Sequence, residues 1–192
     1  MKAIVCKAFG PPESLVLEER PRLEPGPGQV VVKVKAASVK FSDTLLIQNK
    51  YQTKPELPFI PGGEVTGIVT SLGSGVEGWK VGDRVSAQTT YGGYAEEVVA
   101  EAERLAAIPD SMDFAAATGL SSTYGTAYYA LVDRGRLRAG ETLLVLGAAG
   151  GVGLAAVEVG KVLGAKVIAC ASSAEKLAPS ASTADGVPAK YR

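Results

Sequence analysis

The chain has 192 residues, of which 46% are hydrophobic and 21% are charged, a composition typical of a globular protein. Lysine plus arginine equals aspartate plus glutamate at 20 each, so no basic excess favours nucleic acid or an anionic membrane as a partner. The sequence contains no histidine, which excludes Ser-His-Asp catalysis, Cys-His catalysis and a histidine-based zinc site.

The two cysteines, Cys6 and Cys170, are far apart in the sequence and belong to no CxxC pair. Isolated cysteines fit a reducing compartment better than a disulfide framework. The N-terminus has no signal-like apolar core, and no stretch approaches the ~18 consecutive apolar residues of a membrane span. We therefore expect a cytoplasmic protein without a membrane partner.

The first 110 residues predict a small, irregular β domain. Valines alternate with lysines in residues 29–37, as expected for a strand with one face in solvent. A helical spacing covers residues 41–49, and Ser42 or Asp43 could cap its start. The other predicted strands are residues 2–6, 15–18, 65–72, 84–87 and 94–100.

Beyond Pro109 the pattern changes to predicted helices and apolar strands. Asp110 or Ser111 is placed to cap a helix that continues to Tyr124, and residues 126–134 predict a further helix. Residues 142–146 and 166–171 read as buried strands on either side of a helix at 151–163. Residues 172–192 contain Pro179 and Pro188 and are poor material for a helix.

A glycine turn joins the first of these strands to its helix. Its sequence is Gly-Ala-Ala-Gly-Gly-Val-Gly at residues 147–153, one residue longer than the common dinucleotide-binding spacing. Glycines let a pyrophosphate approach the backbone N–H groups at a helix N-terminus. We predict that Gly150, Gly151, Val152 and Gly153 bind a dinucleotide; the alternative is a turn that merely permits close packing.

The end of the second strand indicates which dinucleotide. NAD sites usually place a carboxylate there to bond the ribose 2′-hydroxyl. This chain has Ser172 and Ser173 instead, followed by Lys176, so two hydroxyls and a cation could bond a 2′-phosphate. The pattern favours NADPH over NADH, although Lys176 taken alone could equally be a solvated helix lysine.

Several separated motifs now agree in order and spacing. They are Phe-Ile-Pro-Gly-Gly-Glu-Val-Thr-Gly at 59–67, Val-Gly-Asp-Arg-Val at 81–85, Gly-Gly-Tyr-Ala-Glu at 92–96 and the glycine turn. Nearly end to end, the chain resembles the zinc-independent quinone oxidoreductases (zeta-crystallin-like) of the medium-chain dehydrogenase/reductase superfamily. The resemblance implies an α/β fold with a β-rich start: a GroES-like substrate domain over residues 1–125, then an incomplete Rossmann (doubly wound) NADPH-binding domain over residues 126–192.

The resemblance also bears on metal binding. Zinc-dependent relatives carry a ligand histidine where this chain has Gly63, a ligand cysteine at the position of Lys40 and a second cysteine near Ala117. None of these three residues is a zinc ligand. The resemblance therefore implies a site without metal.

Individual residues take roles from the same resemblance. Thr126 matches a threonine that contacts the cofactor, and Tyr191 joins Ser172 and Lys176 around the 2′-phosphate. Tyr51 matches an active-site tyrosine that could supply a proton, or it could simply anchor the end of a helix. Lys40 replaces the family asparagine and could hold a carboxylate or phosphate, or disturb nicotinamide placement.

The implied activity is NADPH-dependent, zinc-independent transfer of hydride to a quinone or activated enone. One alternative is an enoyl-thioester or 2-alkenal reductase on the same fold, with Tyr51 as proton donor. Another is a truncated, non-catalytic binding protein, because full-length relatives are much longer and we expect only two Rossmann strands here, with an unpaired edge. The homodimer implied for full-length relatives is not expected of this chain.

Overall fold

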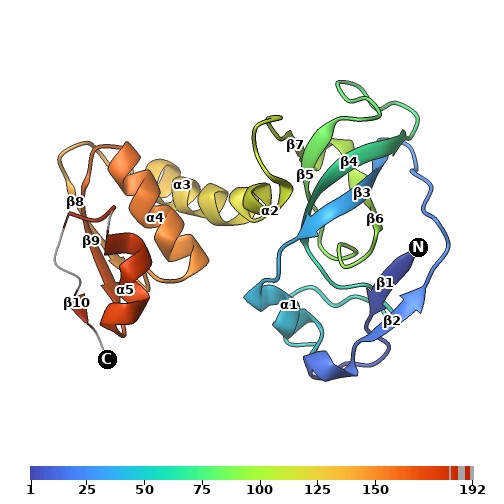
Figure 1. Cartoon of the computed structure of the whole chain (residues 1–192), viewed down its shortest axis with the longest axis horizontal. Helices are drawn as coiled ribbons and strands as arrows, with labels where there is room; N and C mark the ends of the chain where they lie inside the picture. The colour runs from blue at the N-terminus through green and yellow to red at the C-terminus, as the bar shows by residue number, and fades with distance from the viewer. Residues whose placement is uncertain (182, 186–188, 191–192) are drawn as a thin grey trace. The chain divides into compact units, whose positions relative to one another are not determined.

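A computed structural model describes residues 1–181, 183–185 and 189–190 of the chain (Figure 1). The chain divides into two compact units, Met1–Gly119 and Leu120–Arg192. The expected functional boundary between residues 125 and 126 stays a prediction. No helix in the described ranges has both the length and the apolar character needed to cross a membrane.

A five-stranded antiparallel sheet forms the centre of the first unit. Its strands lie in the order β6-β3-β4-β5-β7, and alternation buries the valines Val30 and Val32 while Lys33 and Lys35 stay exposed. Val34, predicted on the buried face, is only half-buried, and Val31, on the face predicted to lie in solvent, is buried at 2% exposure. The strands are β3 (Gln29–Ala37), β4 (Glu64–Leu72), β5 (Arg84–Gln88), β6 (Glu97–Glu101) and the unpredicted β7 (Leu105–Ala107).

A smaller apolar cluster lies beside this sheet. Strands β1 (Lys2–Val5) and β2 (Val16–Glu19) form a two-stranded antiparallel sheet, with a 3-10 turn η1 (Pro12–Ser14) between them. Helix α1 (Phe41–Leu46) is shorter than predicted and ends ahead of Asn49, whose φ of 57° is left-handed. Buried residues of this cluster are Cys6, Leu46, Ile47 and Phe59.

The single helix predicted up to Tyr124 is wrong, because the chain turns at Gly119, whose φ is +93°. Helix α2 (Phe114–Ala117) ends before that turn, and Asp113, not Asp110 or Ser111, caps it by accepting from the N–H of Ala115 at 2.8 Å. The remaining segments here are η2 (Ala102–Arg104), the π-helical η3 (Leu120–Tyr124), α3 (Gly125–Tyr128) and the π-helical η4 (Tyr129–Arg134).

A parallel sheet organises the second unit. Strands β8 (Thr142–Leu146) and β9 (Lys166–Ala171) are joined through helix α4 (Gly151–Val162), as predicted. A short third strand, β10 (Ala189–Lys190), pairs with β9 and gives the order β10-β9-β8, so the expectation of two strands is corrected. Within the described ranges, β8 pairs with β9 alone. Leu144 and Leu146 are 56% and 66% exposed, so the expectation that residues 142–146 form a buried strand is wrong for these two leucines.

Residues after β9 form a helix, contrary to prediction. Helix α5 (Ala174–Ala181) begins after Ser173, whose hydroxyl accepts from the N–H of Lys176 at 3.3 Å. Leu177 is buried in the apolar cluster that also contains Val157 and Val167. This packing supports the helix although Pro179 within it removes one backbone donor.

Candidate functional site

The glycine turn folds in a way that only glycine permits. Gly147 has a left-handed φ of +71°, and its carbonyl oxygen accepts from the N–H of Gly150 at 3.0 Å. A Cβ on Gly153 would lie 2.2 Å from that same oxygen, far inside van der Waals contact. The turn therefore brings the start of α4 against the end of β8 without any intervening side chain.

The start of α4 presents backbone donors. Its N-cap is Gly150, which has no side chain to cap the first turn, and the N–H of Leu154 is bonded to the carbonyl of Gly150 at 2.8 Å. The N–H groups of Gly151, Val152 and Gly153 precede that bond and have no partner within the helix. Such an arrangement can bind a phosphate group, so these residues fit the pyrophosphate of a dinucleotide.

The residues predicted to bond a 2′-phosphate lie together at the end of β9. The ammonium of Lys176 donates to the hydroxyl of Ser172 at 3.3 Å, and both side chains are exposed. Ser173 is partly occupied as the cap of α5. Tyr191, assigned to the same pocket, lies outside the described residues.

Thr126 lies in α3 and is exposed, but its hydroxyl donates to the carbonyl of Ser122. A tyrosine that the sequence did not single out fixes this segment: the hydroxyl of Tyr124 donates to Glu158 of α4. The hydrogen bond to Glu158, with burial as a second cause, raises the pKa of Tyr124. This contact ties the segment that carries Thr126 to the helix that follows the glycine turn.

Lys40 belongs to a polar network inside the first unit. Its ammonium lies 3.8 Å from Oε2 of Glu64, a carboxylate with 0% exposure, while the Lys40 side chain is 28% exposed. Ser38 Oγ lies 3.4 Å from the same Oε2. The sequence analysis did not identify Glu64. The available indication was a single acidic residue at the start of a buried strand, because a carboxylate is rarely buried without a partner.

Asp43 anchors the backbone at Lys40. Its Oδ2 accepts from the N–H of Lys40 at 2.8 Å and from the hydroxyl of Tyr94 at 2.9 Å, and the residue is buried. Burial, followed by the hydrogen bond to Asp43, raises the pKa of Tyr94 well above its usual range. The N-cap of α1 is therefore Lys40, not Ser42 or Asp43 as predicted, and Asp43 supports the first turn from its third position. Tyr94 is a member of the network that the sequence did not reveal.

The positions compared above with the zinc ligands of zinc-dependent relatives are Lys40, Gly63 and Ala117. A Cβ added to Gly63 would lie 3.4 Å from Nζ of Lys40, and Ala117 is a buried alanine in α2. In the described part of the chain, no group of three or more His, Cys, Asp or Glu side chains could hold a metal ion. A cationic side chain therefore lies beside the glycine where zinc-dependent relatives carry a ligand histidine.

Tyr51 packs against the apolar cluster around Phe59 and Leu46. A ring held in this way fits the anchoring alternative directly, and its role as a proton donor stays a prediction. Tyr51 and Lys40 both belong to the first unit, whereas the described cofactor residues belong to the second.

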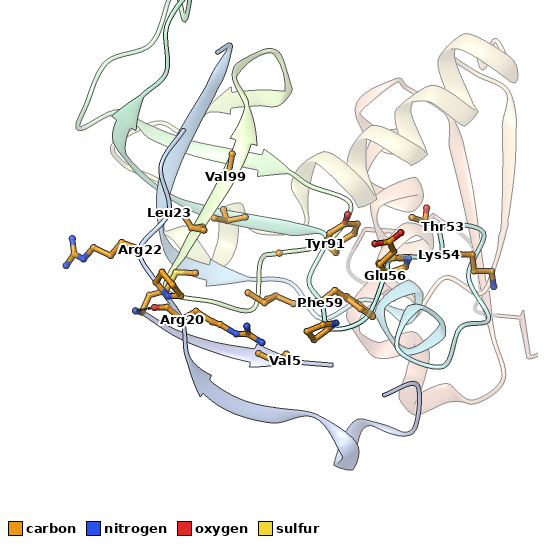
Figure 2. Close-up of a pocket in the computed structure, with 17 residues that line it drawn as sticks. Val5, Arg20, Arg22, Leu23, Thr53, Lys54, Glu56, Phe59, Tyr91 and Val99 are labelled. Carbon is orange, nitrogen blue, oxygen red and sulfur yellow. Dashed lines mark hydrogen bonds between the residues drawn. The ribbon is translucent and has the colours of Figure 1, made fainter. Parts of the chain in front are cut away.

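The first unit also contains an apolar cavity of about 740 Å³ (Figure 2). Phe59 and Tyr91 meet edge to face in it, with ring centroids 6.0 Å apart. Arg20 and Arg22 lie on one side of the view and Lys54 on the other. Of the described residues that line it, none is a predicted site residue. Its lining comes from separate segments of the chain, so no local pattern could have identified it.

Comparison with known proteins identifies the relatives. Residues 26–110 match the alcohol dehydrogenase GroES-like domain. A quinone oxidoreductase-like protein 2 homolog of Nematostella vectensis is 44% identical over 179 residues, 92% of this chain and 48% of that protein. The quinone oxidoreductase of Rattus norvegicus is 41% identical over 177 residues, 91% of this chain and 54% of that protein.

A solved structure agrees with these relatives. The quinone oxidoreductase of Thermus thermophilus, solved also in complex with NADPH, matches with a TM-score of 0.83 and 38% sequence identity. The match covers 96% of this chain and 58% of that one. The chain spans about half the length of the curated relatives it matches.

Proposed function

The chain belongs to the quinone oxidoreductase family of the medium-chain dehydrogenase/reductase superfamily, and from this premise we propose that it serves an NADPH-dependent transfer of hydride to a quinone or activated enone. The observation that carries the proposal is the uncapped start of α4 behind a turn in which Gly153 admits no side chain. NADPH, when bound, supplies the hydride.

The chain's own residues would hold the cofactor at two places. The N–H groups of Gly151, Val152 and Gly153 would bind the pyrophosphate. Ser172, Ser173 and Lys176, with Tyr191, would bind the 2′-phosphate, because an ammonium 3.3 Å from a hydroxyl provides donors for it and the residues directly after β9 are serines instead of a carboxylate. Thr126 would contact the cofactor from α3.

The proposed reaction needs no zinc. Support comes from Lys40, Gly63 and Ala117, none of which can ligate a metal. The acceptor is a small molecule, and reduction of a quinone requires little acid–base machinery, which suits a chain without histidine. Cys6 and Cys170, both free and buried, fit the cytoplasm as its compartment.

The decisive experiment is calorimetric titration of the chain with NADPH and with NADH, followed by NADPH consumption in the presence of 1,4-benzoquinone. We expect NADPH to bind more tightly than NADH, and Lys176→Met to remove most of the difference. Lys166→Met is the matched control, because Lys166 is an exposed lysine at the start of β9. Absence of both NADPH binding and NADPH consumption would refute the proposal.

The same assay separates quinone reduction from the enoyl-thioester alternative. An enoyl thioester reduced faster than the quinone, with loss of that activity in Tyr51→Phe, would favour the alternative and give Tyr51 the role of proton donor. The packing of Tyr51 in the apolar cluster supports the opposite result, in which Tyr51→Phe leaves turnover nearly unchanged.

A further inference from the structure

We propose that the ammonium of Lys40, held by the buried carboxylate of Glu64, binds the carbonyl oxygen of the acceptor and stabilises the negative charge that this oxygen gains on reduction. The inference rests on the proposed function for its substrate class, a quinone or enone. Its geometry, however, lies entirely within the first unit.

The position of Lys40 is fixed from two sides. Its backbone N–H donates to Asp43, which also accepts from Tyr94, and its ammonium pairs with Glu64 at 3.8 Å. A carboxylate with 0% exposure strongly favours a cation beside it, because an uncompensated buried charge costs several kcal/mol. A cation held in advance loses little entropy or reorganisation energy when a ligand arrives.

The ammonium of Lys40 also has N–H donors that the pair with Glu64 does not use. A separation of 3.8 Å is an ion pair longer than a hydrogen bond, and an ammonium carries three N–H donors. The side chain is 28% exposed, and the neighbouring Gly63 has no side chain to cover it. Lys40 can therefore donate to a ligand while the pair with Glu64 stays intact.

A carbonyl suits this position better than an anion. A carboxylate or phosphate would have to give up its strong hydration in a half-buried place. A carbonyl arrives neutral. When hydride adds to the conjugated acceptor, the electron pair of the C=O bond moves onto the oxygen, Lys40 holds the resulting oxyanion, and a proton from water completes the hydroxyl.

Binding tests this assignment without turnover. 4-Nitrophenolate imitates the oxyanion, and its visible absorbance reports binding. We expect the wild-type chain to bind it, neutral 2-cyclohexenone to displace it, and Lys40→Met to weaken it at least about tenfold. Lys35→Met is the matched control, since Lys35 is an exposed lysine on β3. No binding by wild type, or equal binding by Lys40→Met, would overturn the inference.

A second variant guards against misfolding. Lys40→Met alone leaves Glu64 without its ammonium, so Lys40→Met combined with Glu64→Gln removes both charges at nearly constant shape. This double variant should fold and still fail to bind. Wild-type binding by the double variant would mean that Lys40 only neutralises Glu64. Displacement of the probe by acetate or phosphate at lower concentration than cyclohexenone would identify an anion site instead, and would also overturn the assignment.

Turnover separates this inference from the proposed function. With 1,4-benzoquinone and NADPH, we expect Lys40→Met to lower kcat/KM about a hundredfold while the Kd for NADPH stays unchanged. Full turnover in Lys40→Met would reject the role of Lys40 and leave the proposed function standing. If the chain bound the probe through Lys40 but consumed no NADPH, the role of Lys40 in binding would stand and the proposed function would be rejected.

Discussion

The two units of this chain hold their candidate functional groups in opposite ways. In the first unit, Asp43 and Glu64 are buried and hydrogen-bonded or paired, so the network around Lys40 is part of the folded core. In the second unit, Ser172 and Lys176 are exposed, and the turn before α4 contributes backbone N–H groups. Substitutions at the first site should therefore change stability and binding together, whereas at the second site the glycines and Ser173, the cap of α5, are the residues expected to combine the two.

A matched pair of glycine substitutions gives the largest test of this comparison. Gly67→Ala in β4 and Gly153→Ala in α4 would place a Cβ 2.1 Å from the carbonyl of Lys33 and 2.2 Å from that of Gly147. Since backbone atoms cannot yield cheaply, we expect each to cost at least ~3 kcal/mol. Gly125→Ala, with open space around its Cβ, is the control and should be neutral or slightly stabilising.

Urea unfolding can be followed in the two units separately by two spectroscopic signals. Trp79, the single tryptophan, lies in the first unit, and helical circular dichroism follows α4 and α5 of the second. Gly67→Ala should shift the Trp79 transition, and Gly153→Ala the helical one. Equal shifts of both transitions in either variant would show that the units unfold together and would break the comparison.

Asp43→Ala is the next largest test. It removes the acceptor of two hydrogen bonds in a buried place, so we expect a loss of about 2–3 kcal/mol in the free energy of unfolding, measured through Trp79. Asp110→Ala, at a fully exposed aspartate, should change nothing measurable. Tyr94→Phe removes only one of these two hydrogen bonds. If Asp43→Ala lowered the free energy of unfolding by less than Tyr94→Phe does, Asp43 would not be the residue that holds the network together.

Alkaline pH tests the same network. Burial and Asp43 raise the pKa of Tyr94, so above about pH 10, where a tyrosine of the unfolded chain ionises, the unfolded state loses a proton that the folded state retains. Stability from this group is complete below that pH and falls as pH rises, by less than about 1.4 kcal/mol per pH unit. Unfolding measured from about pH 9 to about pH 11 should fall less steeply in Tyr94→Phe than in wild type.

The smallest effect is expected at the exposed site. Ser172→Ala removes one hydroxyl beside Lys176, so NADPH affinity should fall about three- to tenfold, with NADH affinity and stability unchanged. Calorimetry with both nucleotides checks this. An equal loss for NADH would place Ser172 away from the 2′-phosphate.

Local sequence pattern was sufficient to predict the elements whose structure depends mainly on their own residues. The strands at 29–37, 142–146 and 166–171 and the glycine turn follow from alternation, apolar runs and glycine spacing, and the structure has them at those residues. It was insufficient where packing decides. Helix α5 forms despite Pro179 because Leu177 enters the core, and α2 stops because Gly119 takes a left-handed φ.

The candidate site divides in the same manner. Gly150, Ser172 and Lys176 are close in sequence or follow neighbouring parallel strands, so their pattern was visible. The pairing of Lys40 with Glu64 joins residues from α1's start and β4, and Tyr94 reaches Asp43 across 51 positions of sequence. Such contacts join separate segments of the chain, whose packing a single sequence does not encode locally.

Each unit contains one buried cysteine, so thiol labelling can report on the opening of each unit separately. Cys6 is fully buried in the first unit, where burial raises its pKa, and Cys170 is buried at the end of β9 in the second. A thiol reagent can reach either sulfur only when the surrounding structure opens. The labelling rates of Cys6→Ser and Cys170→Ser variants, each retaining one thiol, would therefore give the opening frequency of one unit while the other stays silent.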